Sequence, residues 1–309
     1  MYKINNIYNN NEENNKDLMY IWLSNIPEMS YIIYLRLLKI FDDISNLYNE
    51  SKNKSKFIHI LYSNNIKLSK VLISSLTNFN LKLNSLKIYN NLKKQNICIL
   101  NISSKNYPKQ LFQIYNPPFC IYLYGKESFI KNKIVYLHYE GFNKYGKNIY
   151  DLISYYLKLK NIYSIKKYDN FKYILDSNEI YLKNLENTIF LHCDNILNAN
   201  YDFLNKFNKL NKEIKNISKE NVHIIIPKCN NYYINEVICA IASICIIPQA
   251  KYSKECFLKN MVDIFLELNK NILVCPGNIY CENNYFSNYL IKEGADVILN
   301  VKDIDRYIN

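Results

Sequence analysis

The pattern of apolar positions divides the chain into a helical first part and a second part in which short apolar runs alternate with helix-like stretches. In the first part apolar residues recur at helical spacing in four stretches: 17–26, 31–41, 54–62 and 68–76. Asp17 is expected to cap the first of these helices, and Pro27 to end it. We therefore predict an all-helical module over residues 17–80, after an Asn-rich N-terminus, 1–16, that is expected to be disordered.

In the remainder, residues 81–309, the pattern of apolar runs predicts a single α/β domain. It begins with a connector, 81–125, that contains a helical segment and a strand, and it continues with seven apolar runs: 134–137, 162–165, 188–192, 222–226, 244–247, 272–275 and 297–299. Helix-like stretches separate several of these runs: 147–160, 235–242, 260–268 and 286–292. Fully apolar strands separated by helices indicate an extended Rossmann-like, doubly wound, mostly parallel sheet covered on both faces.

Two of the five glycines lie in the last strand–loop–helix–strand unit, residues 271–303. Gly277 follows Pro276 at the end of an apolar run, where a sharp turn is expected. Gly294 follows the amphipathic segment 286–292, where it is expected to end the helix. This unit carries the clearest local signals in the chain.

Charge indicates an anionic partner. The formal net charge is +12 and the pI is near 9.0, which favours a polyanion or an anionic surface. Lysine supplies nearly all of this charge, because Arg36 and Arg306 are the two arginines, so a general excess of lysine is the alternative explanation.

The remaining composition favours a cytoplasmic protein without a metal or cofactor. The nine cysteines are scattered singly and none has zinc-ligand spacing, so they are expected to be reduced, and mostly buried, thiols. No apolar run reaches the ~18–20 residues of a membrane span, and the N-terminus lacks the apolar core of a signal peptide. We expect no membrane association.

The candidate site follows from the sheet, because ligands of open α/β sheets bind beyond the carboxyl ends of the strands. Lysines recur after the predicted strands, and they predict an anion-binding edge: Lys144, Lys147, Lys166, Lys167, Lys228, Lys251 and Lys254. A solvated lysine rim without function is the alternative. Among the histidines, His138 is the candidate for this edge, since it directly follows a strand.

Four segments resemble the DNA-processing protein A (DprA/Smf) family, in order and over residues 18–305. These are LMYIWLSNIPEMSYIIYLRLLKIF, similar to the family's helical (SAM or helix-hairpin-like) module, then YPKQLFQIYNPPFCIYLYGK, CAIASICIIPQA and PGNIYCENNYFSNYLIKEGADVILNVKDI. The resemblance implies a non-enzymatic protein that binds single-stranded DNA, forms a homodimer and loads a RecA-type recombinase during DNA uptake and recombination. It also adds Asn235 to the candidate DNA-binding residues, as the asparagine of the family's Arg-Asn-Arg segment.

The departures from the family pattern fall on its functional positions. The Gly-Ser/Thr-Arg loop corresponds here to His138, Tyr139 and Glu140, and the arginines around Asn235 are Ile234 and Glu236. A Cβ in place of a glycine obstructs the approach of backbone N–H groups to phosphate, and an acid in place of arginine repels it. DNA binding is therefore expected to be weakened.

Three functions stay open at this point. The first is weak, salt-sensitive single-strand binding, in which tyrosines near the lysine edge stack on bases. The second is a degenerate homologue that acts as a non-catalytic scaffold for a partner. The third is a related Rossmann enzyme that cleaves nucleotide glycosidic bonds, which is disfavoured because Pro276–Gly277 lacks the rest of that group's glycine loop and its catalytic acid.

Overall fold

Six helices precede the first strand in the part of the chain that the structure describes. The computed structural model describes residues 12–125, 132–139, 143–167, 187–194, 222–227, 231–252 and 257–308. The helices are α1 (Glu12–Ser24), α2 (Tyr31–Phe41), α3 (Ile44–Glu50), α4 (Lys54–Ser63), α5 (Lys70–Leu76) and α6 (Phe79–Lys94). Asp17 lies inside α1, so the expectation that it caps this helix is wrong. Residues 12–16 belong to α1, and the predicted domain boundaries stay a prediction.

Polar side chains begin the other helices where the chain turns. Ser30 accepts from Ile33 N at the start of α2, and Asp43 accepts from Asn46 N at the start of α3, a helix that the periodicity did not predict. Such caps satisfy backbone N–H groups that have no partner within the helix. Trp22 is fully buried, and its ring meets that of Tyr48 edge to face, so it belongs to the core.

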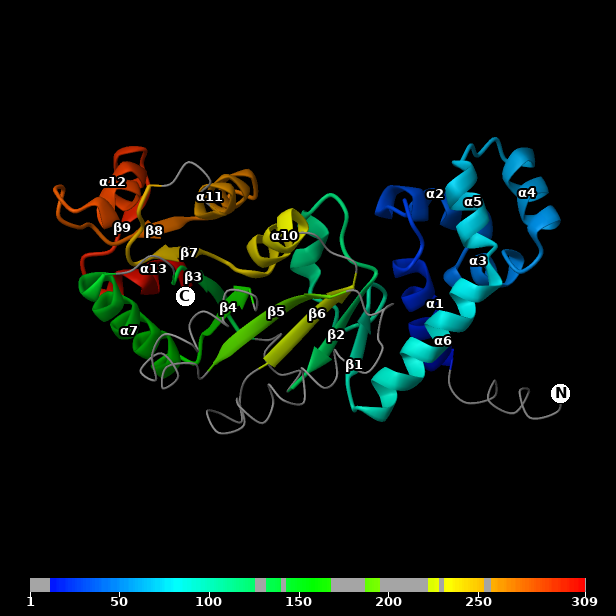
Figure 1. Ribbon diagram of the computed structural model, residues 1–309, viewed down its shortest axis with the longest axis horizontal. Coiled ribbons are helices and arrows are strands. Elements are labelled where there is room, and N and C mark those ends of the chain that lie inside the picture. Colours follow the sequence, from blue (N-terminus) through cyan, green and yellow to red (C-terminus); the bar gives the residue numbers. More distant parts are fainter. Residues whose placement is uncertain are drawn as a thin grey trace.

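One nine-stranded sheet forms the rest of the scaffold (Figure 1). Its strands are β1 (Cys98–Asn101), β2 (Cys120–Tyr124), β3 (Ile134–Leu137), β4 (Tyr163–Lys167), β5 (Thr188–Asp194), β6 (Val222–Pro227), β7 (Cys245–Ile247), β8 (Ile272–Val274) and β9 (Asp296–Val297). Their order is β1-β2-β6-β5-β4-β3-β7-β8-β9. The pairs β1–β2 and β2–β6 are antiparallel and all the others are parallel. The predicted mostly parallel α/β sheet is confirmed.

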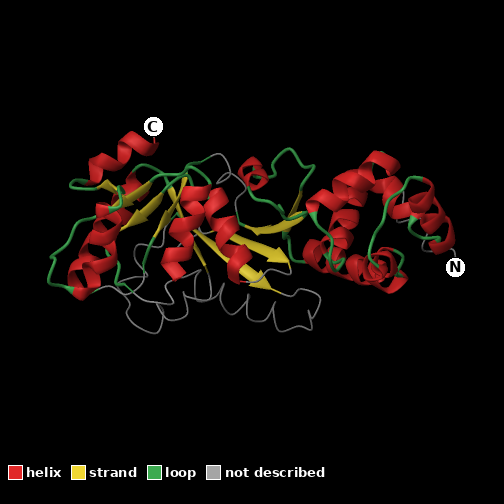
Figure 2. Ribbon diagram, turned by 90° about the horizontal axis from the view of Figure 1, so that it is seen from above, coloured by secondary structure: helices red, strands yellow, loops and turns green. Residues whose placement is uncertain are grey.

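Helices cover both faces of this sheet (Figure 2). The described ones are α7 (Lys144–Leu159), α10 (Asn231–Ile241), α11 (Phe257–Glu267), α12 (Tyr285–Lys292) and α13 (Asp305–Ile308), with 3-10 turns at η2 (Lys109–Gln113), η6 (Glu282–Asn284) and η7 (Val301–Ile304). Alternate residues of β3 separate the two layers: Tyr136 packs in the cluster that includes α10 and α11, whereas Val135 and Leu137 pack in the cluster that includes α7 and α13.

The helical module lies against the antiparallel edge, at the opposite end of the sheet from β9 (Figure 1). Asn101 of β1 donates an amide hydrogen bond of 2.7 Å to Asp17 of α1. Tyr31 N at the start of α2 donates to Asn116 Oδ1, also at 2.7 Å, in the proline-rich segment before β2. Apolar packing and these two bonds join the module to the sheet.

Within the described part of the chain, six cysteines have free thiols and none forms a disulfide: Cys98, Cys120, Cys239, Cys245, Cys275 and Cys281. Of these, Cys120, Cys239, Cys245 and Cys275 are buried, and burial raises the pKa of the Cys275 thiol to about 12. The described residues hold no group of three or more His, Cys, Asp or Glu side chains placed to bind a metal. No described helix is long and apolar enough to cross a membrane.

Candidate nucleic-acid interface

The topology places a candidate ligand site between β3 and β7. From β3 the chain builds the sheet outward through β4, β5 and β6, and it then returns to the other side of β3 with β7, β8 and β9. The connections after β3 and β7 therefore diverge at their carboxyl ends, which leaves a crevice there. His138 and Tyr139 follow β3, Gln249 follows β7, and Pro276 and Gly277 follow β8.

The N-terminus of α7 opens onto this crevice. Asn143 caps the helix, since its side-chain oxygen accepts from Gly146 N at 3.1 Å. Lys144 is exposed and Lys147 is half-buried, and both lie in the first turn, at the positive end of the helix dipole. Tyr145 reaches across the crevice and donates from its hydroxyl to Pro276 O at 2.6 Å. This end of α7 combines positive charge with an aromatic ring.

Gln249 fills the space under that helix end. It is fully buried; its Oε1 accepts from Asn143 N at 3.0 Å, and its Nε2 donates to Asn284 Oδ1 at 2.7 Å. A Cβ on Gly146 would lie 2.1 Å from Oε1 of Gln249. The glycine is thus required by the buried amide beneath it, and the strand end and the helix start are fixed to each other.

Gly277 has the same role on the other wall. A Cβ there would lie 2.2–2.5 Å from the side-chain amide of Asn284. Asn288 secures the glycine backbone, with Gly277 N donating to its Oδ1 at 3.2 Å and its Nδ2 donating to Gly277 O at 3.1 Å. In the described chain, the glycines with a positive φ are Gly125 and Gly294. Gly277 is not one of them, so the expected need for a glycine turn there is wrong, and the glycine is needed because a side chain has no space. The helix-ending role of Gly294 is confirmed.

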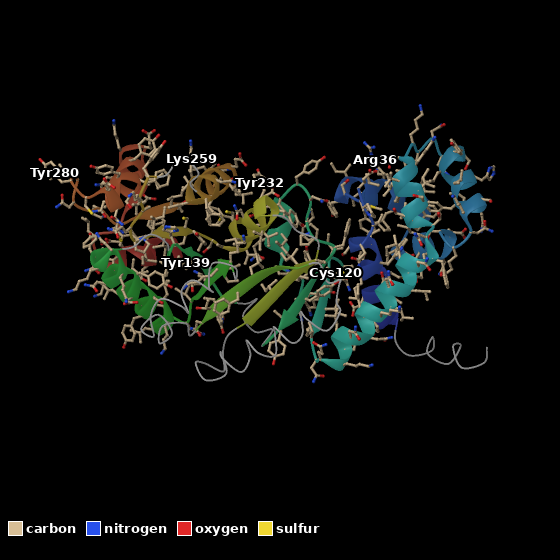
Figure 3. All side chains as sticks on the ribbon, viewed as in Figure 1. Arg36, Cys120, Tyr139, Tyr232, Lys259 and Tyr280 are labelled. Atoms are coloured by element: carbon tan, nitrogen blue, oxygen red, sulfur yellow. The ribbon has the colours of Figure 1, made fainter. Side chains whose placement is uncertain are left out.

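These walls enclose a pocket of about 510 Å³ whose lining is neutral: Asn143, Tyr145, Pro276, Gly277, Asn278, Cys281 and Asn284. Amide groups both donate and accept hydrogen bonds, and the pocket offers no cation of its own to a phosphate. Tyr280, 87 % exposed, projects from the same loop at the end of the molecule (Figure 3). The pocket is suited to the edge of a base or a sugar, with positive charge on its rim at α7.

Of the eight predicted DNA-binding residues, the structure brings Lys144 and Lys147 together at this crevice. Lys251 is exposed near it, and its ammonium forms an ion pair of 2.9 Å with Glu282. Lys166, Lys167 and Asn235 are buried. Lys228 and Lys254 lie outside the described residues, as does Glu140.

Lys166 lies inside the protein, between β4 and α7. Its Nζ contacts the Tyr150 hydroxyl and lies 4.7 Å from the Tyr150 ring centroid and 5.1 Å from that of Tyr139. Burial lowers the pKa of Lys166 from 10.5 to about 7, and Asp151 partly opposes this shift. The two rings supply part of the stabilisation that water gives to an exposed ammonium. In this position Lys166 supports the packing of α7 and does not face solvent.

Asn235 and its neighbour differ in exposure. Asn235 is 3 % exposed, and its Oδ1 has no hydrogen-bond partner among the described residues. Glu236 is half-buried. Its pKa is raised mainly by burial and to a smaller extent by the negative charge of Glu267. His138 is also buried, 3.5 Å from the Tyr136 hydroxyl through Nδ1.

Gln249 could be assigned to this edge from the sequence, because it is the polar residue directly after a buried apolar strand, in IIPQA. Sequence reasoning missed three residues that line the pocket: Asn143, Cys281 and Asn284. Asn143 and Asn284 carry no such signal, because asparagine is frequent throughout the chain.

No family model matches this sequence, and no curated protein matches it. Among solved structures, the chain is similar to DNA processing protein A from Streptococcus pneumoniae, with a TM-score of 0.53 and 17 % identity over 85 % of this chain and 96 % of that one. It is also similar to DNA processing protein A from Helicobacter pylori, known from structural work on its single-stranded DNA binding mode, with a TM-score of 0.50 and 18 % identity over 68 % of this chain and 94 % of that one. The chain therefore has the fold of DNA processing protein A, as its sequence motifs predict.

Proposed function

We propose that this chain is a distant member of the DNA-processing protein A family that binds single-stranded DNA at the β3–β7 crevice. The observation that carries the proposal is the shared fold over most of the chain, together with the single-strand binding described for the Helicobacter pylori protein. The crevice lies where an open α/β sheet binds its ligands, and α7 presents Lys144 and Lys147 there.

The geometry indicates how a single strand would be held. The positive end of the α7 dipole and its two lysines attract the phosphate backbone without reading its sequence. Tyr145 and Tyr280 offer exposed ring faces on which unpaired bases stack. The neutral amides of the pocket hydrogen-bond base or sugar edges. Affinity is expected to be modest, because the candidate cations Lys166 and Lys167 are buried.

The expected cellular role is that of the family: loading of a RecA-type recombinase on single strands during DNA uptake and recombination, in the cytoplasm. A homodimer is part of this proposal. Exposed apolar side chains of α7, Leu152, Tyr155 and Leu159, are 54–65 % exposed, and Leu299 beside β9 is 82 % exposed. A hollow of about 290 Å³ lies between α7 and the β9–η7 segment. A second copy of the chain is the occupant that we propose for this apolar face.

The second candidate function is a degenerate homologue that serves as a non-catalytic scaffold and binds a protein partner without DNA. One observation favours it: Gln249 and Asn143 occupy backbone groups at the α7 N-terminus that would otherwise be available to a phosphate. Intact partner binding without any single-strand binding would identify this alternative.

The location of the site is tested with a pair of double variants and a labelled oligo-dT. Lys144→Gln/Lys147→Gln removes two positive charges from the crevice, and Lys259→Gln/Lys292→Gln removes two exposed ones from α11 and α12. We expect the crevice variant to bind about tenfold more weakly at low salt, with a shallower dependence of affinity on salt. Equal losses in both variants would contradict a site at the crevice.

A further inference from the structure

The positive charge of the chain is concentrated in one stretch. Residues 51–125 contain eleven lysines and no aspartate, glutamate or arginine, whereas the other 234 residues contain 28 basic and 27 acidic residues. This acid-free tract therefore carries eleven of the twelve net charges. A uniform excess of lysine does not explain it, because acids are absent from the tract but present on both sides of it, at Glu50 and Glu127.

The structure describes the whole tract, which comprises α4, α5, α6, β1, η2 and β2. Ten of its lysines are exposed: Lys52, Lys54, Lys56, Lys67, Lys70, Lys87, Lys93, Lys94, Lys105 and Lys109. The exception is Lys82, whose buried ammonium donates to Tyr48 O and Ser51 Oγ and lies over the Trp22 ring. Lys56 forms an ion pair with Glu50, at the border of the tract. The tract thus presents lysines to solvent without acids of its own to neutralise them.

This arrangement is unfavourable for the isolated protein. Like charges on one small module repel each other, and Lys54 and Lys56 lie in the first turn of α4, where the helix dipole disfavours a cation. None of the helices α3, α4, α5 and α6 has an acid in its first turn. A bound polyanion removes the repulsion and turns the same charges into a favourable contribution.

Exposed rings among these lysines favour a single strand over a duplex. Tyr62 is 73 % exposed, Phe79 is 68 % exposed and Tyr115 is 74 % exposed. Aromatic faces stack on unpaired bases, which a duplex keeps inside its own stack. On α6, Phe79 and the partly exposed Leu83 and Leu86, both close to 40 % exposed, form a short apolar stripe.

We propose that the acid-free tract, which joins the helical module to the first two strands, is a second binding surface for single-stranded nucleic acid, separate from the β3–β7 crevice. The module lies at the opposite end of the molecule from α7, β8 and β9 (Figure 1). A strand held here is bound through its phosphates and stacked bases, with little preference for sequence. The observations that support this surface do not involve the crevice, so each of the two proposals is tested by its own variant.

The test compares two triple variants of the full chain, Lys54→Gln/Lys67→Gln/Lys70→Gln in the tract and Lys259→Gln/Lys292→Gln/Lys302→Gln at the other end, all at exposed positions. Fluorescence anisotropy with labelled oligo-dT is measured over a range of salt concentrations. We expect about tenfold weaker binding of the tract variant at low salt and a salt slope reduced by about 2, since each lysine–phosphate contact contributes ~0.7 on a single strand. The control variant is expected to change affinity less than threefold.

Equal effects of the two triple variants, with both still folded by circular dichroism, would overturn the proposal. An anionic phospholipid surface is the other partner that a basic, partly apolar module fits. Vesicles of anionic phospholipid are therefore added as competitor. If the protein keeps the labelled strand when vesicles are present, the proposal is supported. If the vesicles displace the strand, and the wild-type protein binds them more tightly than the tract variant does, the proposal is overturned. The crevice double variant, measured in parallel, reports separately on the proposed function.

Discussion

Gly146 and Gln249 share one volume at the carboxyl edge of the sheet, since a Cβ on the glycine would lie 2.1 Å from Oε1 of the buried amide. Gly146→Ala is expected to destabilise the fold by about 1–3 kcal/mol, because the side chain of Gln249 is held by Asn143 and Asn284 and has no room to move away. Urea unfolding at neutral pH measures this loss.

A double variant separates this contact from other effects of the alanine. Gly146→Ala/Gln249→Ala is expected to be less destabilised than the sum of its two single variants, since removal of Gln249 also removes the clash. Gly294→Ala is the control: φ is +103° there and no atom lies within 4 Å of the added Cβ, so its cost is backbone strain. Additivity with Gln249→Ala is expected for Gly294→Ala, and additivity for Gly146→Ala as well would refute the shared volume.

Lys166 gives the protein a pH dependence of stability. Its pKa is about 7 in the folded protein and 10.5 for the unperturbed group, so between these values the unfolded chain binds a proton that the folded chain does not. Stability therefore rises with pH in this window, by up to about 1.4 kcal/mol per pH unit from this one group. Lys166→Met removes the contribution.

The comparison of the wild-type protein with Lys166→Met between pH 7 and 9 isolates this effect. Burial also lowers the pKa of Lys82 and Lys270 to about 8, and both lysines are present in both proteins, so their contributions cancel. We expect the difference in unfolding free energy to shift steadily in favour of the wild-type protein as pH increases. Parallel pH profiles would place the Lys166 ammonium in contact with water.

At Lys54 stability and binding are expected to move in opposite directions. The residue starts α4, where a positive charge opposes the helix dipole. Lys54→Glu should therefore raise the unfolding free energy by about 0.3–1 kcal/mol while weakening oligo-dT binding. Thermal unfolding and anisotropy on the same sample measure both quantities. A stabilised variant with undiminished binding would remove Lys54 from the surface proposed for the acid-free tract.

Self-association is tested on the exposed face of α7. Leu152→Asp/Leu159→Asp places two charges on the apolar face proposed for the homodimer, and it should convert the dimer to a monomer in size-exclusion chromatography with light scattering. Leu266→Asp on α11 is the control, since Leu266 is 59 % exposed on another helix. A wild-type protein that is monomeric at tens of micromolar would refute the dimer.

The fold could be predicted from the sequence because its strands are buried on both faces. Seven short apolar runs separated by helix-like stretches have few arrangements other than a covered parallel sheet, and β3 was predicted to the residue. The helix α3 was not predicted, because its sequence, ISNLYNE, is only seven residues long and mostly polar, and so shows little helical periodicity. Asp17 was predicted to cap a helix that in fact begins at Glu12, and local capping rules do not show that the residues before Asp17 are already helical.

The site was harder to predict because strand ends were uncertain by one or two residues. The predicted strand at 162–165 continues to Lys167, and this extension moves Lys166 and Lys167 from an exposed edge into the sheet. The amides of Asn143, Gln249 and Asn284 meet from three separate segments, so no spacing in the sequence connects them.

Single-strand binding by the wild-type chain is the central claim, and equilibrium anisotropy with a labelled oligo-dT at low salt tests it most directly. We expect saturable binding at micromolar protein that weakens steadily as salt is raised, and that an unlabelled single strand competes for. Absence of saturable binding at micromolar protein and low salt would contradict the account and leave the non-catalytic scaffold.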